Sequence, residues 1–218
     1  MMVGKTVLAW VMAYLIGSIP AGLFWAWVTK KVDVRQHGSG RTGGGNVWRT
    51  AGFGAAVLTV LSDALKGAVA IFVARAMGLS AWAVALAGTL AVVGHNHSIF
   101  LKFHGGAGTM TSLGVIAAYS WTGALAVFVV PGLLIVWLVG HTSVASIYIA
   151  LVMPLFFALR GDLPTTLAFA LPTMALTLWS LRPNIRRLYR REERFIQPYK
   201  KNPPPICISK HPAKEKKG

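Results

Sequence analysis

A glycine-rich segment between residues 30 and 50 carries side chains suited to binding a phosphate group. Five of the eight residues from 38 to 45 are glycine, and glycine adopts the positive φ angles with which backbone N–H groups form an anion-binding nest. The polar donors and cations of the segment are Ser39, Arg41, Thr42, Asn46 and Arg49. Because an arginine can place two N–H donors on phosphate oxygens, we interpret the segment as a phosphate-binding loop. The alternative is a flexible loop with the charge usual beside a membrane.

A second cluster combines three histidines with a glycine-rich turn. The turn, Gly105–Gly108, leads directly into an apolar run, and the free N–H groups of a helix N-terminus attract anions. The histidines are His95, His97 and His104. We interpret them as candidate proton acceptors. Metal binding is the less favoured alternative, because no carboxylate or cysteine lies nearby in the sequence.

Two opposite charges, Asp63 and Lys66, interrupt another apolar run. They are three residues apart, so a helix would place them on one face. Ionisable groups inside a membrane span are expensive and often functional. A site residue pair and a structural ion bridge both remain open as interpretations.

The elements that must position these residues are membrane-spanning helices. The sequence of 218 residues is 55% hydrophobic, with a mean hydropathy of +0.57. About 20 apolar residues are needed to span a bilayer as a helix, and five runs meet that need: residues 6–29, 79–101, 121–139, 144–159 and 163–181. Two further runs, 53–77 and 108–120, are weaker. We therefore predict an all-α integral membrane protein with seven transmembrane helices, or five if the weaker runs do not span.

The distribution of charge predicts how the helices are oriented. The formal net charge is +16, and seven spans place 18 of the 22 Lys and Arg residues on one face. Cytoplasmic loops carry such an excess, so the N-terminus is predicted outside, with the glycine-rich loops and the tail in the cytoplasm. The tail is expected to contact anionic membrane lipids. Nucleic acid is disfavoured, because the sequence shows no aromatic–basic binding module.

One membrane domain, residues 1–196, is followed by a basic tail, residues 197–218. The first apolar run is too long for a signal peptide and is predicted to be a retained helix. Residues 182–195 are predicted to form a basic amphipathic helix on the membrane surface, and the tail after them to be disordered. The single cysteine, Cys207, excludes an internal disulfide.

The motifs together resemble the bacterial acyl-phosphate:glycerol-3-phosphate acyltransferase family from about Tyr14 to Phe195. The similar segments occur in the family's order: residues 17–20, 33–40 with 46–49, 63–67, 94–95 with 103–108, 143–147, and 184–188. The resemblance implies a seven-helix membrane enzyme without a metal or cofactor. Its substrates would be an acyl phosphate and glycerol-3-phosphate, and its products lysophosphatidic acid, acylated at the sn-1 hydroxyl, and phosphate.

The resemblance also implies site residues. Those that carry over are Ser39, Asn46, Arg49, His95, Gly105, Gly106, Gly108, Ser143 and Asn184. His95, Ser143 and Asn184 are assigned to catalysis, and the others, with Arg41, to substrate binding. Arg49 with Ser39 is expected to hold one phosphate, and the Gly105–Gly108 backbone the acyl phosphate. His95 would position or deprotonate the hydroxyl, with a substrate phosphate as the alternative base. Ser143 could also be a simple helix N-cap, close to His141.

Several positions depart from the family pattern. Ala107 stands where the family usually has lysine, and Arg41 where it has asparagine. We expect the charge of Arg41 to compensate for the lysine. The other departures are Gly44-Gly45, His104 and Leu181. The alternatives are a related transferase with another acceptor or donor, a paralogue that binds a phosphorylated lipid or metabolite without turnover, and, least favoured, a transporter.

Overall fold

The computed structural model describes residues 2–196, 199 and 202–210, and every regular element in that part of the chain is a helix. The α-helices of the first half are α1 (Met2–Ser18), α2 (Ala21–Lys30), α3 (Gly44–Ala51), α4 (Phe53–Ala76), α5 (Ala81–Asn96) and α6 (Thr109–Tyr119). Those of the second half are α7 (Trp121–Gly123), α8 (Val130–Val139), α9 (Thr142–Leu159), α10 (Leu163–Thr165), α11 (Leu171–Ser180) and α12 (Arg182–Tyr189). Two short 3-10 turns, η1 (Val34–Gln36) and η2 (Ile99–Leu101), lie in loops, and two π-helical segments, η3 (Ala124–Val129) and η4 (Thr166–Ala170), interrupt longer helices.

Five helical stretches of the described residues are long and apolar enough to cross a membrane. They are Met2–Lys30, Phe53–Ala76, Ala81–Leu101, Trp121–Val139 and Thr142–Leu159. The weaker run that contains Asp63 and Lys66 is thus one continuous helix of 24 residues, α4. The two remaining expected spans are also helical: α6, with 11 residues, and residues 163–180, formed by α10, η4 and α11. The all-helical membrane architecture is confirmed.

Small residues let the helices that carry the site pack closely. A Cβ atom at Gly17 of α1 would overlap the Ala91 carbonyl oxygen of α5, and one at Gly114 of α6 would overlap that of Ala64 in α4. Close backbone approach at glycine is the usual way in which membrane helices associate. Phe128, Phe157 and Phe169 are completely buried and fill the core between the second-half helices and this group.

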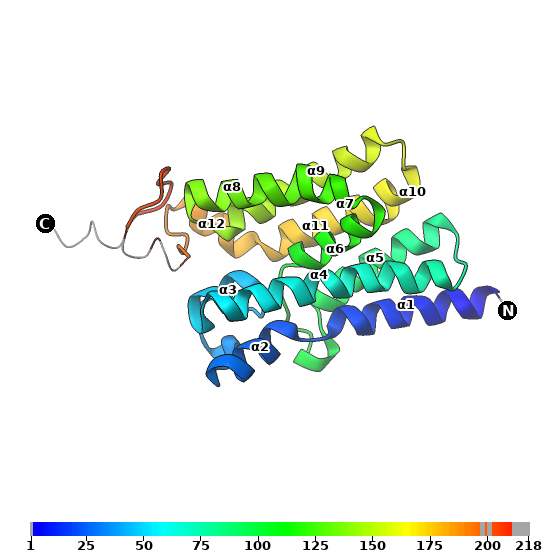
Figure 1. The fold of residues 1–218 in the computed structure, drawn as a ribbon, viewed down its shortest axis with the longest axis horizontal. Coiled ribbons are helices and arrows are strands. Elements are labelled where there is room, and N and C mark those ends of the chain that lie inside the picture. The colour runs from blue at the N-terminus through cyan, green and yellow to red at the C-terminus, as the bar shows by residue number, and fades with distance from the viewer. Residues whose placement is uncertain (1, 197–198, 200–201, 211–218) are drawn as a thin grey trace, which may run out of the picture.

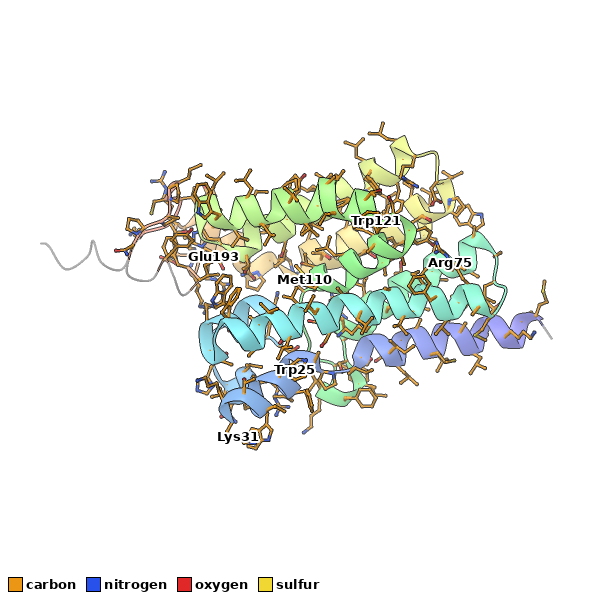
Figure 2. The ribbon with its side chains drawn as sticks, in the orientation of Figure 1. Trp25, Lys31, Arg75, Met110, Trp121 and Glu193 are labelled. Carbon is orange, nitrogen blue, oxygen red and sulfur yellow. The ribbon has the colours of Figure 1, made fainter. Side chains whose placement is uncertain are left out.

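The helices α2, α3 and α12 gather at one end of the bundle, opposite the N-terminus (Figure 1). Glu193 and Lys31 lie at this end, whereas Arg75 lies toward the other (Figure 2). We call it the α3 end. The first basic loop, which joins α2 to α3, and the start of the C-terminal segment therefore share one end of the molecule, as the positive charge of the sequence predicts.

The C-terminal segment departs from expectation. The helix predicted for residues 182–195 ends at Tyr189, and Arg191 has a φ of 59°, so the chain turns there. It then runs back against the α8–α9 junction, where the Ile196 N–H donates to the Gly140 carbonyl (3.1 Å) and the Ile206 N–H to the Leu138 carbonyl (2.8 Å). Residues 202–210 of the predicted disordered tail thus contact the bundle. Its Lys-rich end, residues 211–218, lies outside the described residues.

Candidate active site

Asn46 organises the first glycine-rich loop. It lies in the first turn of α3 and is 2% exposed. Its Oδ1 atom accepts from the Ser39 N–H at 3.0 Å. Its Nδ2 atom donates to the carbonyl oxygens of Val34 (3.0 Å), His37 (3.0 Å) and Arg41 (2.9 Å). The amide that the sequence suggests as a phosphate donor is therefore occupied in shaping the loop. Gly38, with a φ of 60°, leaves room for it, since a Cβ there would overlap Asn46 Oδ1.

Arg49, one turn further along α3, lines a cavity of about 670 Å³ at the α3 end of the bundle. The other lining residues are Val32, His37, Gly38, Thr50, Glu192, Glu193, Arg194, Phe195 and Lys210. Burial lowers the pKa of Arg49 from its ordinary value to about 10, against the opposing effect of the Glu193 carboxylate. Arg49 therefore remains a cation at neutral pH, partly removed from water, where its attraction for an anion is stronger than at the surface.

Glu193 is the carboxylate that sequence reasoning missed. It is 4% exposed and accepts hydrogen bonds from Asn184 Nδ2 and Arg187 Nε, each at 2.9 Å. Asn184, assigned to catalysis from the resemblance, thus directs its amide group toward Glu193. The signal available in the sequence was an acidic pair, Glu192-Glu193, directly after an arginine-rich helix.

Four arginines surround this one buried carboxylate. The charges of Glu193 and Arg187 act on both Arg41 and Arg49, and Arg194 acts on Arg49 as well. The pKa of Arg41 is lowered, chiefly by burial and also by the charge of Arg187. Because Glu193 and the exposed Glu192 together cannot neutralise four guanidinium groups, the region keeps an excess of positive charge. A phosphate with about two negative charges would neutralise much of that excess.

Arg41 connects this region to the second cluster. Its Nη2 atom donates a hydrogen bond to the Ser180 carbonyl oxygen at the end of α11. The Ser180 hydroxyl in turn accepts from Asn96 Nδ2 (3.1 Å), in the last turn of α5. A Cβ at Gly108 would approach the Oδ1 atom of Asn96 to 2.7 Å. The guanidinium of Arg41 is therefore two hydrogen bonds away from the residue that packs against the glycine turn.

His95 lies under that glycine turn. The Gly106 N–H donates to the His95 carbonyl oxygen at 3.1 Å. A Cβ at Gly105 would overlap the same oxygen, and a Cβ at Gly106 would overlap His95 Nε2. Only glycine fits at these two positions. Gly108, with a φ of 87°, is the N-cap residue directly before α6. The two glycine-rich features of the sequence thus have different partners, Asn46 for the first and His95 for the second.

The charged pair inside α4 contacts the imidazole ring of His95. Asp63 Oδ1 and Lys66 Nζ form an ion pair at 2.8 Å, and Lys66 Nζ also lies 2.8 Å from His95 Nδ1. All three side chains are buried. The sequence left open whether Asp63 and Lys66 belong to the site or only stabilise the bundle. In the structure the pair contacts a predicted site residue directly. His97 and His104 make other contacts: the His97 carbonyl accepts from Tyr14, and His104 bonds its own turn at the Lys102 carbonyl.

Ser143 lies in the first turn of α9, which begins at Thr142 without a side-chain cap. Its hydroxyl is buried and has no hydrogen-bond partner among the described residues, so the N-cap interpretation is not realised. The neighbouring His141 bonds the Arg194 carbonyl through Nδ1 (3.1 Å) and stacks on Phe195 at 4.4 Å. Thr142 contacts Gly45, where a side chain would meet its hydroxyl. The start of α9 is thereby fixed beside the start of α3.

Comparisons with known proteins identify the family. A model of the family described as glycerol-3-phosphate acyltransferase matches residues 7–191. The chain belongs to the glycerol-3-phosphate acyltransferase family. It is 42% identical to glycerol-3-phosphate acyltransferase 1 of Deinococcus radiodurans over 191 residues, which cover 87% of this chain and 94% of the relative. The corresponding protein of Thermus thermophilus is 38% identical, with 85% and 92% covered.

Solved structures agree with this assignment. The chain matches the crystal structure of PlsY (YgiH), an integral membrane glycerol 3-phosphate acyltransferase, in its glycerol 3-phosphate form. The TM-score is 0.79 at 33% identity, and 88% of this chain and 96% of that one are covered. The lysophosphatidic acid form gives a TM-score of 0.77. The protein is thus an acyltransferase of this family and an integral membrane enzyme.

Apart from Ser143 at the start of α9, the predicted site residues of this acyltransferase fall into two groups that Arg41 joins. Ser39, Asn46 and Arg49 belong to the first loop and α3, beside Asn184 and the cavity, and His95 lies with Gly105, Gly106 and Gly108. Sequence reasoning missed Glu193, the contact of Lys66 with His95, and the link through Ser180 and Asn96. Among the residues that the structure describes, no group of three or more His, Cys, Asp or Glu is arranged to hold a metal ion.

Proposed function

We propose that the protein transfers a fatty acyl group from an acyl phosphate to the sn-1 hydroxyl of glycerol-3-phosphate, giving lysophosphatidic acid and inorganic phosphate for phospholipid synthesis. The observation that carries the proposal is the excess of positive charge from Arg41, Arg49, Arg187 and Arg194 around buried Glu193, beside a cavity of about 670 Å³. Two phosphorylated substrates need such charge. The names of the relatives and the two ligand forms of PlsY support the same substrate and product.

Each substrate phosphate has a set of groups suited to it. The cavity lined by Arg49 takes glycerol-3-phosphate, with the Ser39 hydroxyl as a neutral donor. The backbone of Gly105–Gly108 at the start of α6 takes the acyl phosphate. Arg41, bonded to Ser180 near the end of α5, supplies there the charge that the family's lysine supplies elsewhere. The start of α9, where the Ser143 hydroxyl has no hydrogen-bond partner in the described part of the chain, adds a donor for a polar group of either substrate.

Transfer then requires no covalent enzyme intermediate. The hydroxyl oxygen attacks the acyl carbon, the carbon–oxygen bond to phosphate breaks, and the hydroxyl proton ends on the departing phosphate. Holding the two substrates in the right geometry can supply about 7–11 kcal/mol of the barrier. Donors aimed at the developing oxyanion are worth about 2.7–4 kcal/mol each. The apolar, lipid-facing exteriors of the helices leave the fatty chain of both substrate and product in the membrane.

The membrane setting belongs to the same proposal. The protein lies in the bacterial plasma membrane with the α3 end in the cytoplasm and the N-terminus outside, because Lys and Arg concentrate at the α3 end. The exposed arginines of α12, Arg182 and Arg186, contact anionic lipid headgroups. Arg182 stacks over Trp179, an exposed aromatic side chain suited to the membrane interface.

Donor choice is the sharpest test of the chemistry. The purified full-length protein in lipid nanodiscs is offered glycerol-3-phosphate with either palmitoyl phosphate or palmitoyl-CoA. Lysophosphatidic acid is expected with palmitoyl phosphate alone, because the glycine turn binds a small phosphate anion next to the acyl carbon. Turnover with palmitoyl-CoA as the better donor would contradict the proposal. Binding of glycerol-3-phosphate without turnover of either donor would favour a paralogue that only binds its ligand.

A further inference from the structure

Three acceptor atoms lie close to the Lys66 ammonium, two within hydrogen-bonding geometry and one as an ion pair. Its ammonium lies 2.8 Å from Asp63 Oδ1, 3.1 Å from the Ile19 carbonyl oxygen and 2.8 Å from His95 Nδ1. Lysine carries three N–H donors and no acceptor. Because the group is 6% exposed, water supplies little alternative. The contact between Lys66 and His95 is therefore one in which Lys66 donates and Nδ1 accepts.

This direction fixes where His95 carries its proton. A neutral imidazole has one protonated and one bare nitrogen, and the partner of one nitrogen decides the state of the other. If Nδ1 is bare, the proton is on Nε2. An imidazolium would point its Nδ1–H at an ammonium 2.8 Å away, which burial makes costly.

The competing arrangement has poorer geometry. Nδ1–H could donate to Asp63 Oδ1, but that distance is 3.4 Å, beyond the usual range for such a bond. The same oxygen already faces Lys66 at 2.8 Å. The structure thus favours Lys66 over Asp63 as the partner of Nδ1, with Asp63 balancing the charge of Lys66.

The other nitrogen of the ring faces the glycine turn. A Cβ at Gly106 would overlap His95 Nε2, so the imidazole fills the space under the turn where a side chain would otherwise be. Among the residues that the structure describes, none forms a hydrogen bond with Nε2. A proton at Nε2 is therefore directed at the backbone segment to which the proposed function assigns the acyl phosphate.

We propose that Lys66, supported by Asp63, is a positioning residue that holds His95 in its Nε2–H form and so gives the glycine turn a side-chain donor. His95 in this form donates at Nε2 to an oxygen of a ligand in the turn. It is not the group that takes the hydroxyl proton. The identity of that ligand rests on the proposed function, whereas the tautomer does not.

The test is a ring nitrogen NMR spectrum of the full-length protein in lipid nanodiscs at neutral pH, with ¹⁵N-labelled histidine. Subtracting the spectrum of His95→Gln identifies the two His95 signals, since protonated and bare ring nitrogens differ in chemical shift. The wild-type protein is expected to show protonated Nε2 and bare Nδ1. In Lys66→Met the donor to Nδ1 is lost, and Nδ1 is expected to become protonated toward Asp63. A wild-type ring protonated at Nδ1, or an unchanged ring in Lys66→Met, would overturn the proposal.

Two variants separate this effect from damage to the fold. Asp63→Asn/Lys66→Met removes both buried charges, so it is expected to remain folded and still to lose the preference for Nε2–H. Thr59→Val removes the buried hydrogen bond from Thr59 to the Ala55 carbonyl in the same helix and is expected to leave the His95 signals unchanged.

Steady-state kinetics are a second, independent test of the positioning role of Lys66. Lys66→Met is expected to lower kcat with palmitoyl phosphate by about 10²-fold, the size of a lost oxyanion donor. The KM for glycerol-3-phosphate is expected to change much less, because Arg49 binds that substrate elsewhere. A rise in KM with kcat unchanged would contradict the role. If the protein transferred no acyl group at all, the proposed function would fail while the NMR result could still stand.

Discussion

The guanidinium of Arg41 donates a hydrogen bond to the Ser180 carbonyl oxygen and so ties the first glycine-rich loop to the end of α11. Since Ser180 also bonds Asn96, whose Oδ1 atom faces Gly108, two hydrogen bonds link the guanidinium of Arg41 to the residue that packs against the second glycine turn. This relationship offers a structural basis for the compensation that we expect from the resemblance, in which Arg41 supplies the charge of a lysine at position 107.

Replacing Arg41 tests that exchange. Arg41→Ala is expected to lower kcat with palmitoyl phosphate by about 10²-fold, because a cation at the acyl phosphate is lost. Adding Ala107→Lys to Arg41→Ala is expected to restore most of the activity. Arg35→Ala is the control: Arg35 belongs to the same loop but is exposed and paired with Asp33. A fully active Arg41→Ala protein would contradict the hypothesis that Arg41 compensates for the missing lysine.

The close packing of Gly106 against the His95 ring predicts that position 106 tolerates no side chain. Gly106→Ala is expected to abolish acyl transfer, because its Cβ would overlap His95 Nε2 and force the turn and the ring apart. Gly54→Ala is the matched control, since a Cβ at Gly54 meets no atom within 4 Å. Turnover is measured with palmitoyl phosphate, and folding by thermal unfolding in detergent. Gly106→Ala with wild-type kcat and KM would show that the ring need not approach the turn.

Glu193, whose carboxylate is buried, is expected to contribute more to the free energy of unfolding than its exposed neighbour Glu192. Glu193→Gln removes the charge that faces Arg187 at 2.9 Å and is expected to cost about 2 kcal/mol, the range for hydrogen bonds to charged groups. Glu192→Gln changes an exposed side chain and is expected to stay within about 0.5 kcal/mol of wild type. Unfolding midpoints of the two variants compare them directly. Equal midpoints would mean that the arginine cluster does not depend on Glu193.

Some of this organisation could be predicted from the sequence and some could not. The apolar runs predicted the helices, including α4, because hydropathy alone is enough for a membrane segment. The glycines at 38 and 106 were expected at anion sites. Their partners, Asn46 and His95, emerged only from the fold, since contacts between distant segments leave no local pattern. The Asp63–Lys66 pair was visible, but its contact with His95 depends on how α4 packs on α5.

The structure of the C-terminal segment could not be predicted from its sequence, for a different reason. The sequence predicts a surface helix up to residue 195 and disorder after residue 197, yet Phe195 lies beyond the helix and stacks on His141, and the Ile206 N–H bonds the Leu138 carbonyl. A short segment without periodicity can be held by a few backbone bonds and one aromatic contact, and composition does not reveal these. Glu193 escaped notice for the same reason: it lies in this segment, among arginines that read as surface charge.

The His141–Phe195 contact predicts a dependence of stability on pH. Burial lowers the pKa of His141 below its ordinary value of 6.5, and Arg49 adds to the effect while Glu193 opposes it. Below about pH 6.5 the unfolded chain therefore binds a proton that the folded protein resists. The stability that His141 contributes is complete above this pH and is lost as the pH falls toward the folded pKa.

Thermal unfolding of the wild-type protein and His141→Gln between pH 7.5 and pH 5 measures this contribution. The variant keeps a donor for the Arg194 carbonyl but cannot titrate. The difference in midpoint between the two proteins is expected to shrink or reverse at low pH. A constant difference over the whole range would mean that His141 does not become charged on unfolding.

The central claim is direct transfer from an acyl phosphate to glycerol-3-phosphate at the α3 end of this chain. It is tested by incubating the purified protein in nanodiscs with palmitoyl phosphate and radiolabelled glycerol-3-phosphate, and by measuring both products. We predict sn-1 lysophosphatidic acid and inorganic phosphate in equal amounts, with both lost in Arg49→Ala. Release of phosphate without lysophosphatidic acid, or neither product while glycerol-3-phosphate still binds, would contradict the account.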